Sequence, residues 1–439
     1  MKTLKFGGTS VGKPERMQHI ARLITHDPDR KIIVLSALYG TTNALVEIGK
    51  RLLDKEVDKA RDLILKLSNH YQAFIDTLYS EDRYKESAIE SINIHFDFMN
   101  GLLKSFFNKR LNNELLAQGE LMSTKIFAFY LEEQGINSIL INALDFMYID
   151  EDKEPDITFI NDKLSSILDQ NRHTGIFVTQ GYICRNHERE IDNLQRGGSD
   201  YTATLIGAAI NSPEVQIWTD IDGMHNNDPR IVEKTYAISN LSFNEAAELA
   251  YFGAKILHPS SIWPAQKYNI PVRLKNTMEP DAYGTFISDI EEEKKIKAVA
   301  AKDGITAIKI KSSRMLMAYG FLRKIFQIFE NYRTPIDMIS TSEVAVSLTI
   351  DDSTHLKPIM EELDNFGDVV VDTNQTIICI VGNKIVEKEE ILQKVFQAME
   401  NVPVRMISYG GSRYNISILV DTKFKNDTLK ELNNHIFNL

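Results

Sequence analysis

Two glycine pairs far apart in the chain lie beside charged side chains, and these residues carry the clearest chemical potential. The first pair is in Lys5-Phe6-Gly7-Gly8-Thr9-Ser10, directly after the apolar run Thr3 to Phe6, and the second is in Arg196-Gly197-Gly198-Ser199-Asp200. Glycine lets the backbone approach a ligand closely, and amides at such a turn bind anions. One pair alone fits an ordinary strand-to-helix turn equally well. Two such segments in one chain favour a phosphate-handling site.

Phosphoryl transfer requires cations and hydrogen-bond donors around the moving group, together with an aligned acceptor. Lys5 suits the transferring phosphate because an ammonium is a compact charge that can follow it. Its place inside an apolar strand disfavours a role as an ordinary surface lysine. Asp200 can position lysines and keep them protonated. Ser199 and Asp200 also fit an N-cap pair for the helix that follows, and both roles can hold together.

The elements that position these residues are short β-branched runs alternating with helix-periodic segments. Strands are predicted at 3–6, 31–36, 138–141, 175–180, 215–219 and 272–274, and helices at 14–25, 114–134, 199–210 and 242–253. This alternation predicts a mainly parallel sheet covered on both faces, with ligands at the carboxyl ends of the strands. Residues 51–110 are charged, nearly free of Gly and Pro, and apolar at helical spacing, which predicts an inserted helical subdomain of structural role.

The charged run 289–297 predicts a solvated connector at the end of a first domain, 1–290. Beyond it, strands and helices alternate in two weakly similar sets. The first set has strands at 305–310, 345–350 and 369–371 with helices at 320–332 and 354–364. The second has strands at 376–381 and 415–419 with helices at 387–400 and 426–436. This pattern predicts two small α+β domains, 300–372 and 373–439.

Bulk properties exclude several classes of protein. A chain of 439 residues predicts two to three domains, and its net charge of −11 disfavours nucleic acid or an anionic membrane as a partner. Cys184 and Cys379 are too far apart to show metal-ligand spacing, and no metal site is predicted. No apolar leader and no run approaching the ~20 apolar residues of a membrane span is visible, so we expect a cytoplasmic protein in a reducing compartment.

Five ordered motifs resemble aspartokinase, a member of the amino-acid kinase superfamily. They are KFGGTS at 5–10, AQGELMSTKI at 117–126, RGGSDYTAT at 196–204, WTDIDG at 218–223 and FGAKILHP at 252–259. No P-loop string occurs. The resemblance implies an α/β amino-acid-kinase fold, a mainly parallel sheet with a helical insertion, followed by two ACT-like βαββαβ domains. The chain is similar to the single-function, lysine-sensitive members of the family. No fused dehydrogenase is expected, because nothing follows the second repeat.

The resemblance also implies a reaction. The γ-phosphate of Mg-ATP would pass to the side-chain carboxylate of L-aspartate, giving 4-phospho-L-aspartate for lysine, threonine and methionine biosynthesis, without a tightly bound prosthetic group. The implied catalytic residues are Lys5, Asp200 and Lys255. Glu120 suits the substrate ammonium and Arg196 a carboxylate, with Thr42, Ser36 and Ser199 beside them. The implied nucleotide ligands are Lys5, Phe6, Gly7, Gly8, Thr219, Asp220, Arg230 and Lys255.

The ACT-like repeats imply a regulatory amino acid, with L-lysine expected and L-threonine the alternative. Asp337 offers an anion for an ammonium. The remaining implied contacts are Met315, Gly320, Phe321, Leu322, Thr341 and Glu343. Ala318 departs from the polar residue that is frequent in the family. Subunits are expected to pair through these repeats, as a homodimer or a dimer of dimers.

Two other functions stay open on the residues. One is a kinase for glutamate, N-acetylglutamate or a nucleotide, which the GELMST segment and the C-terminal 150 residues disfavour. The other is a catalytically inactive amino-acid sensor, which the retained charged residues disfavour. His225 stands where relatives often carry an aromatic residue, and Leu38-Tyr39 is bulkier than is usual in that loop.

Overall fold

The computed structural model describes residues 1–194, 197–253, 257–292, 295–312 and 319–439. The chain divides into two compact units. The first consists of Met1–Met224 and Ile256–Asp289, and the second of His225–Lys255 and Ile290–Leu439. Each unit has its own sheet and its own hydrophobic core.

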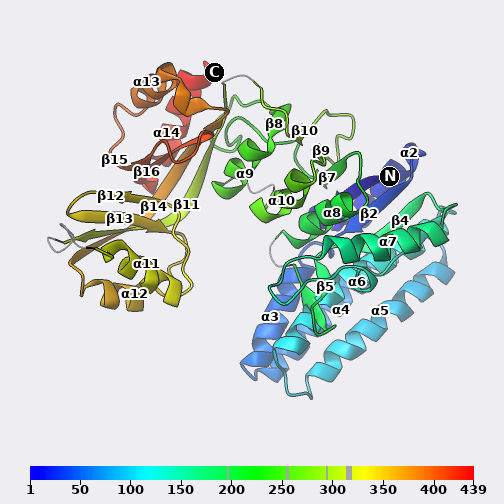
Figure 1. The fold of residues 1–439 in the computed structure, drawn as a ribbon. Coiled ribbons are helices and arrows are strands. Elements are labelled where there is room, and N and C mark those ends of the chain that lie inside the picture. The colour runs from blue at the N-terminus through cyan, green and yellow to red at the C-terminus, as the bar shows by residue number, and fades with distance from the viewer. Residues whose placement is uncertain (195–196, 254–256, 293–294, 313–318) are drawn as a thin grey trace. The chain divides into compact units, whose positions relative to one another are not determined.

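The first unit is built on a parallel sheet (Figure 1). Its parallel strands are β1 Lys2–Phe6, β2 Lys31–Leu35, β3 Ser138–Leu140, β4 Ile176–Gln180, β7 Val215–Thr219 and β9 Val272–Asn276. They lie in the order β3-β4-β2-β1-β7-β9, and β10 (Thr285–Ser288) adds antiparallel to β9. Every residue of β2 and β4 is buried, as expected for strands covered on both faces. The predicted sheet is confirmed.

Helices precede or follow these strands along the chain. They are α1 Gly8–Val11, α2 Pro14–His26, α3 Thr41–Leu53, α4 Val57–Leu78, α5 Asp82–Leu102, α6 Lys109–Glu133, α7 Ile157–Gln170, α8 Gly198–Ala209 and α10 Pro259–Lys267. A hairpin of β5 (Ile183–Arg185) and β6 (Ile191–Asn193) lies outside the main sheet. No helix among the described residues is long and apolar enough to cross a membrane.

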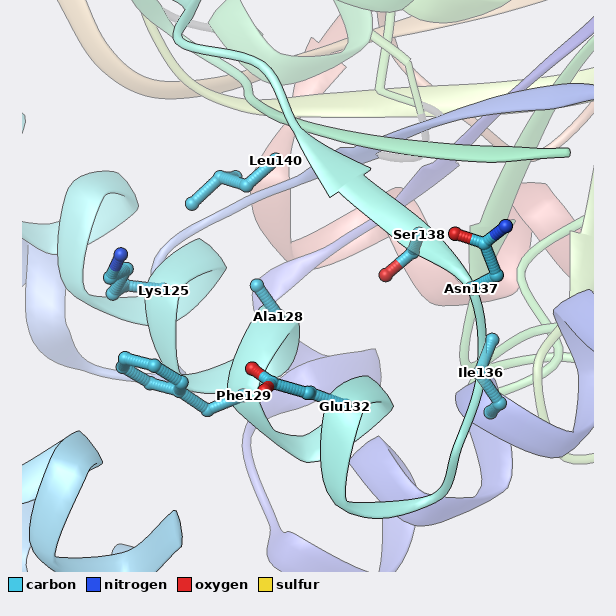
Figure 2. Close-up of a pocket in the computed structure, with 8 residues that line it drawn as sticks. All are labelled: Lys125, Ala128, Phe129, Glu132, Ile136, Asn137, Ser138 and Leu140. Carbon is cyan, nitrogen blue, oxygen red and sulfur yellow. The ribbon is translucent and has the colours of Figure 1, made fainter. Parts of the chain in front are cut away.

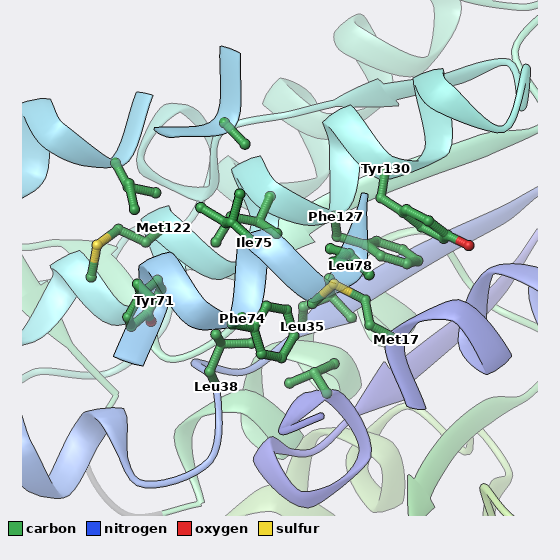
Figure 3. Close-up of a cluster of buried hydrophobic side chains, with 14 of the residues drawn as sticks. Met17, Leu35, Leu38, Tyr71, Phe74, Ile75, Leu78, Met122, Phe127 and Tyr130 are labelled. Carbon is green, nitrogen blue, oxygen red and sulfur yellow. The ribbon is translucent and has the colours of Figure 1, made fainter. Parts of the chain in front are cut away.

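The predicted helices of residues 51–110 form, but they do not enclose a core of their own. Their buried side chains belong to one hydrophobic cluster with the sheet residues Leu4, Ile33 and Leu35. Figure 3 shows Phe74 of α4 among side chains of this cluster, which includes Phe127 of α6. The α4 and α5 helices therefore add to the covering of the sheet, because their apolar faces are buried on the same core.

The second unit contains β8 Asn240–Ser242, α9 Phe243–Tyr251, β11 Ile296–Lys311, α11 Phe321–Asn331, β12 Ile339–Thr341, β13 Ala345–Ile350, α12 Leu356–Leu363, β14 Asp368–Gly382, α13 Glu389–Ala398, β15 Val404–Ser408, β16 Asn415–Asp421 and α14 Lys425–Leu432. One antiparallel sheet has the order β12-β13-β11-β14-β16-β15. Separate clusters lie under each repeat. The two predicted ACT-like patterns are thus halves of a single sheet.

The strands β11 and β14 run through both halves, which differs from the predicted pattern. Residues 306–311 of β11 pair with β13, and residues 305 and 307–311 pair with the first part of β14, whereas residues 298–302 pair with 377–381. The predicted strands 369–371 and 376–381 are one continuous strand. The connector prediction is wrong at its end, where Ile296 and Lys297 begin β11 and are buried. Lys297 avoids an unpaired buried charge by forming an ion pair with Glu292.

Residues 225–255, which the sequence placed in a first domain ending at 290, belong to the second unit. The α9 helix packs on β14. Its Glu248 accepts hydrogen bonds from Ser412 Oγ at 2.8 Å and from Asn415 Nδ2. Val232 lies in the core beneath β14 and β16. These side-chain contacts, which sequence patterns do not report, account for the grouping.

Candidate active site

The carboxyl ends of β4, β2, β1 and β7 meet at one edge of the first unit's sheet. Gly181, Ser36 and Gly7 each come directly after their strand at this edge, and Thr219 is the last residue of β7. Because adjacent parallel strands end side by side, residues far apart in the sequence gather here. Ser36, Thr42, Gly7, Gly8 and Asp220 lie on the segments that follow these strands or on the helices directly after them, and Lys5, Phe6 and Thr219 lie at the ends of the strands themselves.

Lys5 and Asp200 form the central ion pair of this edge. Lys5 Nζ lies 2.6 Å from Asp200 Oδ1, and each side chain is only 12% exposed. Asp200 is in the first turn of α8, whose N-cap is Gly197 with φ +71°. A side chain at Gly197 would lie 2.5 Å from His258 Cβ. The alternative role of Ser199 and Asp200 as an N-cap pair is therefore wrong, because the helix begins before them.

The first glycine pair opens the short helix α1. Gly7 is its N-cap, and the Gly7 amide donates to Trp218 O at 3.4 Å. A side chain at Gly7 would lie 3.3 Å from Lys5 Nζ, so glycine leaves room for the ammonium. Phe6 is fully buried and stacks on Trp218, with ring centroids 5.8 Å apart. A nucleotide contact of Phe6 is thus limited to its backbone.

Glu120 lies on α6 and is 3% exposed. Its Oε1 accepts a hydrogen bond from the Ala37 amide at 3.2 Å, whereas Oε2 has no hydrogen-bond partner among the described residues. Burial raises the pKa of Glu120 to about 8 against the opposing effect of the Ala37 amide. A buried carboxylate oxygen without a donor is costly unless a cation or donor arrives. The arrangement suits a ligand ammonium.

The segment after β2 contains two of the predicted substrate residues, Ser36 and Thr42, both half-buried. Ser36 O accepts a hydrogen bond from Ser123 Oγ of α6 at 2.9 Å. Thr41, beside Thr42, lies 3.1 Å through its Oγ1 from the hydroxyl of Tyr71. The positions of both predicted residues are therefore tied to neighbouring helices.

Ser199, a further predicted substrate residue of this unit, lies close to the strand end at Gly181. A side chain at Gly181 would lie 2.6 Å from Ser199 Cβ. Glycine at this position therefore allows the start of α8 to approach the end of β4.

The predicted nucleotide residues are divided between the two units. Thr219 Oγ1 donates to Asp220 Oδ1 at 3.2 Å, and these are the last residue of β7 and the residue after it, in the first unit. Arg230 belongs to the second unit and contacts both carboxylate oxygens of Asp228, at 2.9 and 2.7 Å. A phosphate would have to compete with Asp228 for this guanidinium. Arg196 and Lys255 lie outside the described residues.

The predicted effector residue Asp337 already contacts a cation in the second unit. Its side chain is 1% exposed, and Oδ1 lies 2.8 Å from Lys302 Nζ of β11. Lys302 also lies 2.8 Å from Asp351, and its ammonium is 4.5 Å from the ring centroid of Tyr251. Tyr251, at the end of α9, donates to Asp337 Oδ1 at 3.1 Å. Burial raises the pKa of Asp337 against the opposing effect of Lys302.

Other predicted effector residues lie around α11 and β12. Gly320 is the N-cap of α11 with φ +79°, and Phe321 begins the helix as a buried residue. Leu322 is half-buried, and Thr341 and Glu343 are exposed. Met315 and Ala318 lie outside the described residues.

A pocket of about 300 Å³ lies between α6 and β3 (Figure 2). Its lining residues are Lys125, Ala128, Phe129, Glu132, Ile136, Asn137, Ser138 and Leu140. None of them is a predicted site residue. In the described parts of the chain, no group of three or more His, Cys, Asp or Glu side chains is placed to hold a metal ion.

Sequence reasoning missed Tyr71, Lys302 and Tyr251. Each lies in a segment without a motif, and each contacts a predicted residue or its neighbour only through the tertiary fold. Aromatic and lysine residues in helices and strands are too common for their spacing to have identified them.

Comparisons with known proteins agree with this architecture. Residues 2–276 match the amino acid kinase family, and residues 378–436 match an ACT domain. The chain is 35% identical to aspartokinase 2, chloroplastic, of Arabidopsis thaliana, covering 99% of this chain and 84% of the relative. It is 31% identical to lysine-sensitive aspartokinase 3 of Escherichia coli, covering 99% and 98%.

Solved structures show the same likeness over the whole chain. Escherichia coli aspartokinase III in complex with aspartate and ADP superposes with a TM-score of 0.82 at 30% identity, covering 100% of both chains. The same enzyme with lysine and aspartate gives a TM-score of 0.81 at 31% identity, covering 100% of this chain and 99% of that one.

Fold, site and comparisons thus define a kinase of the amino-acid type with a C-terminal ACT region. Within the amino acid kinase family, the chain belongs to the aspartokinases.

Proposed function

We propose that this chain phosphorylates the side-chain carboxylate of L-aspartate with Mg-ATP, giving 4-phospho-L-aspartate for lysine, threonine and methionine biosynthesis. The observation that carries the proposal is that the first unit holds both the Lys5–Asp200 ion pair and a buried carboxylate oxygen of Glu120 that has no hydrogen-bond partner within the described ranges. Complexes of a 30% identical aspartokinase with aspartate and ADP support it.

The reaction needs little acid–base chemistry. A carboxylate oxygen of aspartate attacks the γ-phosphorus, an O–P bond forms, and the bond from that phosphorus to the β,γ-bridging oxygen breaks, so that ADP leaves. The acceptor is already ionised at neutral pH, so no general base is required. The protein must align the reactants and stabilise charge on the moving phosphoryl group. Lys5 supplies that charge, and Asp200 holds the Lys5 ammonium in place.

Substrate recognition rests on two charges and on the loop after β2. Glu120 Oε2 would accept the substrate ammonium, which would also favour the ionised form of this buried acid. Arg196 would bind a carboxylate, and Thr42, Ser36 and Ser199 would complete the contacts. Thr219, Asp220, Arg230 and Lys255 would serve the nucleotide, with Mg²⁺ arriving as part of the substrate.

Hydroxylamine trapping tests the proposal directly. Purified protein with Mg-ATP and L-aspartate should form aspartyl hydroxamate, and L-glutamate or N-acetyl-L-glutamate should not replace aspartate. The absence of hydroxamate with aspartate, with and without lysine, threonine and methionine, would refute it. Hydroxamate formed only from another acceptor would assign a different amino-acid kinase activity.

The second unit is proposed to bind a regulatory amino acid, L-lysine first and L-threonine as the alternative. A lysine-bound complex of a 31% identical aspartokinase supports the choice. The effector ammonium would bind Asp337 and would have to compete with Lys302, which occupies one oxygen of that carboxylate. Asp337 Oδ2 is buried and has no hydrogen-bond partner among the described residues. Binding of the effector would thus replace the Lys302 ammonium at Asp337 by the ammonium of the effector.

We also propose that subunits pair through the ACT region, as a homodimer or a dimer of dimers, in the cytoplasm. Cys184 and Cys379 are both buried as free thiols, which is compatible with a reducing compartment. Sedimentation velocity should give a mass at least twice 50.0 kDa. A monomer at micromolar concentration would contradict the pairing.

A further inference from the structure

Tyr71 of α4 places a phenol beside the loop that carries the proposed substrate residues. Its hydroxyl lies 3.1 Å from Thr41 Oγ1, and both residues are 0% exposed. Thr41 is the first residue of α3 and is followed by Thr42. Two buried hydroxyls that satisfy each other are strongly linked, since removing one leaves the other unpaired at a cost of about 1–3 kcal/mol.

The same loop is fixed on a second side by α6. The Ala37 amide donates to Glu120 Oε1 at 3.2 Å. A side chain at Gly119 would lie 2.9 Å from Ala37 Cβ and 3.2 Å from Thr41 Cγ2. The loop is therefore in close contact with α6 at the residue that precedes Glu120.

No side-chain hydrogen bond caps the start of α3, whose N-cap is Gly40 with φ +81°. The hydrogen bond between Thr41 Oγ1 and the Tyr71 hydroxyl ties this turn to the helical insertion. Tyr71 is further located by Phe96 of α5, whose ring is 5.9 Å away in an edge-on arrangement. The phenol is held by packing and cannot readily follow the loop if the loop moves.

The charge of Glu120 also acts on the Tyr71 phenol. Burial raises the pKa of Tyr71, and the carboxylate of Glu120 raises it further against the opposing effect of Thr41. The phenol therefore stays protonated near the group proposed to bind the substrate ammonium. Tyr71 of the insertion thus interacts both with the loop, through Thr41, and with Glu120 of the proposed ammonium site.

We propose that Tyr71 is a positioning residue for the amino-acid substrate, acting through Thr41 on the place of Thr42. This inference rests on the proposed function, in which Thr42 and Glu120 bind the acceptor. It gives the helical insertion of residues 51–110 a part in substrate recognition, beyond its part in the core.

Steady-state kinetics of Tyr71→Phe and Thr41→Val test the proposal. Each variant should raise KM for L-aspartate about tenfold, because a small displacement of a positioning group weakens binding. The kcat value and KM for ATP should stay within about twofold of wild type. The double variant should be no worse than either single one, since both remove the same hydrogen bond.

Tyr79→Phe is the matched control. Tyr79 caps the same helix, is 6% exposed, and donates to Ile126 O of α6 at 2.6 Å, away from the loop. Thermal midpoints of Tyr71→Phe and Tyr79→Phe should fall comparably, while KM for aspartate should rise only in the first. An unchanged KM in Tyr71→Phe, an equal rise in Tyr79→Phe, or additive effects with Thr41→Val would each overturn the proposal.

Failure of the proposed function gives a different result. If wild-type protein phosphorylates another amino acid, the choice of aspartate is wrong, and KM for that acceptor decides the role of Tyr71 by the same comparison. If Tyr71→Phe does not fold, Thr41→Val alone decides it, since a change there keeps the phenol and its packing.

Discussion

At the scale of single residues, the proposed function gives the Lys5–Asp200 ion pair the most direct part in turnover. Lys5→Ala and Asp200→Ala should each lower kcat about 10²-fold or more, because a preorganised charge at the transferring phosphate is lost. Circular dichroism should show the fold retained. Lys2→Ala is the control, because Lys2 is on the same strand but pairs with Asp27 at 2.8 Å. Wild-type turnover in Lys5→Ala would remove Lys5 from the reaction.

The proposed role of Glu120 predicts that substrate binding depends on pH. Its pKa of about 8 means that the free site is mostly protonated near pH 7, whereas an ammonium requires the carboxylate. The kcat/KM value for aspartate should therefore rise up to about tenfold per pH unit towards pH 8 and then level off. Tyr71 and Tyr182 should not contribute, since burial raises the pKa of both phenols. A flat profile in wild type would contradict this assignment.

The same shift affects stability in the opposite direction. Folding raises the pKa of Glu120 from its ordinary 4.5 to about 8. The resulting contribution to the stability of the fold is fully present below pH 4.5 and is lost as the pH rises through about 8. Glu120→Gln should remove this loss and should raise KM for aspartate at every pH. Unfolding midpoints measured between pH 5 and 9 check the first effect, and a wild-type slope in Glu120→Gln would exclude Glu120 as its source.

At the scale of elements, α9 is held in the second unit by two side chains of its C-terminal half. Glu248 binds Ser412, and Tyr251 binds Asp337. The motif that contains Lys255 follows this helix in the sequence. An effector that took Asp337 from Lys302, as proposed, would therefore also change the contacts of Tyr251 and so act directly on α9.

Lys302→Met should strengthen binding of the effector. Removing the internal ammonium leaves Asp337 a buried acid without its cation, and an incoming ammonium then restores the pair without competition. Calorimetry with L-lysine should show roughly tenfold tighter binding, equivalent to about 1.4 kcal/mol. Lys309→Met, at an exposed position of the same strand, should bind as wild type does. Weaker binding to Lys302→Met would show that Lys302 helps the effector instead.

At the scale of the whole molecule, the effector and the substrate should be linked. If lysine weakens aspartate binding by some factor, aspartate must weaken lysine binding by the same factor. Lysine at 100 times its Kd should also stabilise the folded protein by about 2.7 kcal/mol, visible as a higher unfolding midpoint. Asp337→Ala should lose both effects. A wild-type shift in Asp337→Ala would remove this residue from the effector site.

Much of the architecture follows from the sequence because its signals are local. Buried β-branched runs alternating with helical periods predicted the parallel sheet, and glycine beside charge predicted the Lys5 and Asp200 segments. Apolar spacing also predicted the helices now seen as α4 and α5. These features depend on neighbours within one turn or one strand, so the order of residue types is sufficient to indicate them.

Only the tertiary structure decided which distant side chains meet. Tyr71 lies 30 positions from Thr41, and Lys302 lies 35 from Asp337, yet each pair is in hydrogen-bond contact. The continuity of β11 and β14 through both repeats likewise arises from strand pairing across the second unit. Such contacts are set by the packing of whole elements and leave no periodic mark in the chain. The sequence therefore indicated the charged groups of the site, and folding determined the partners that hold them.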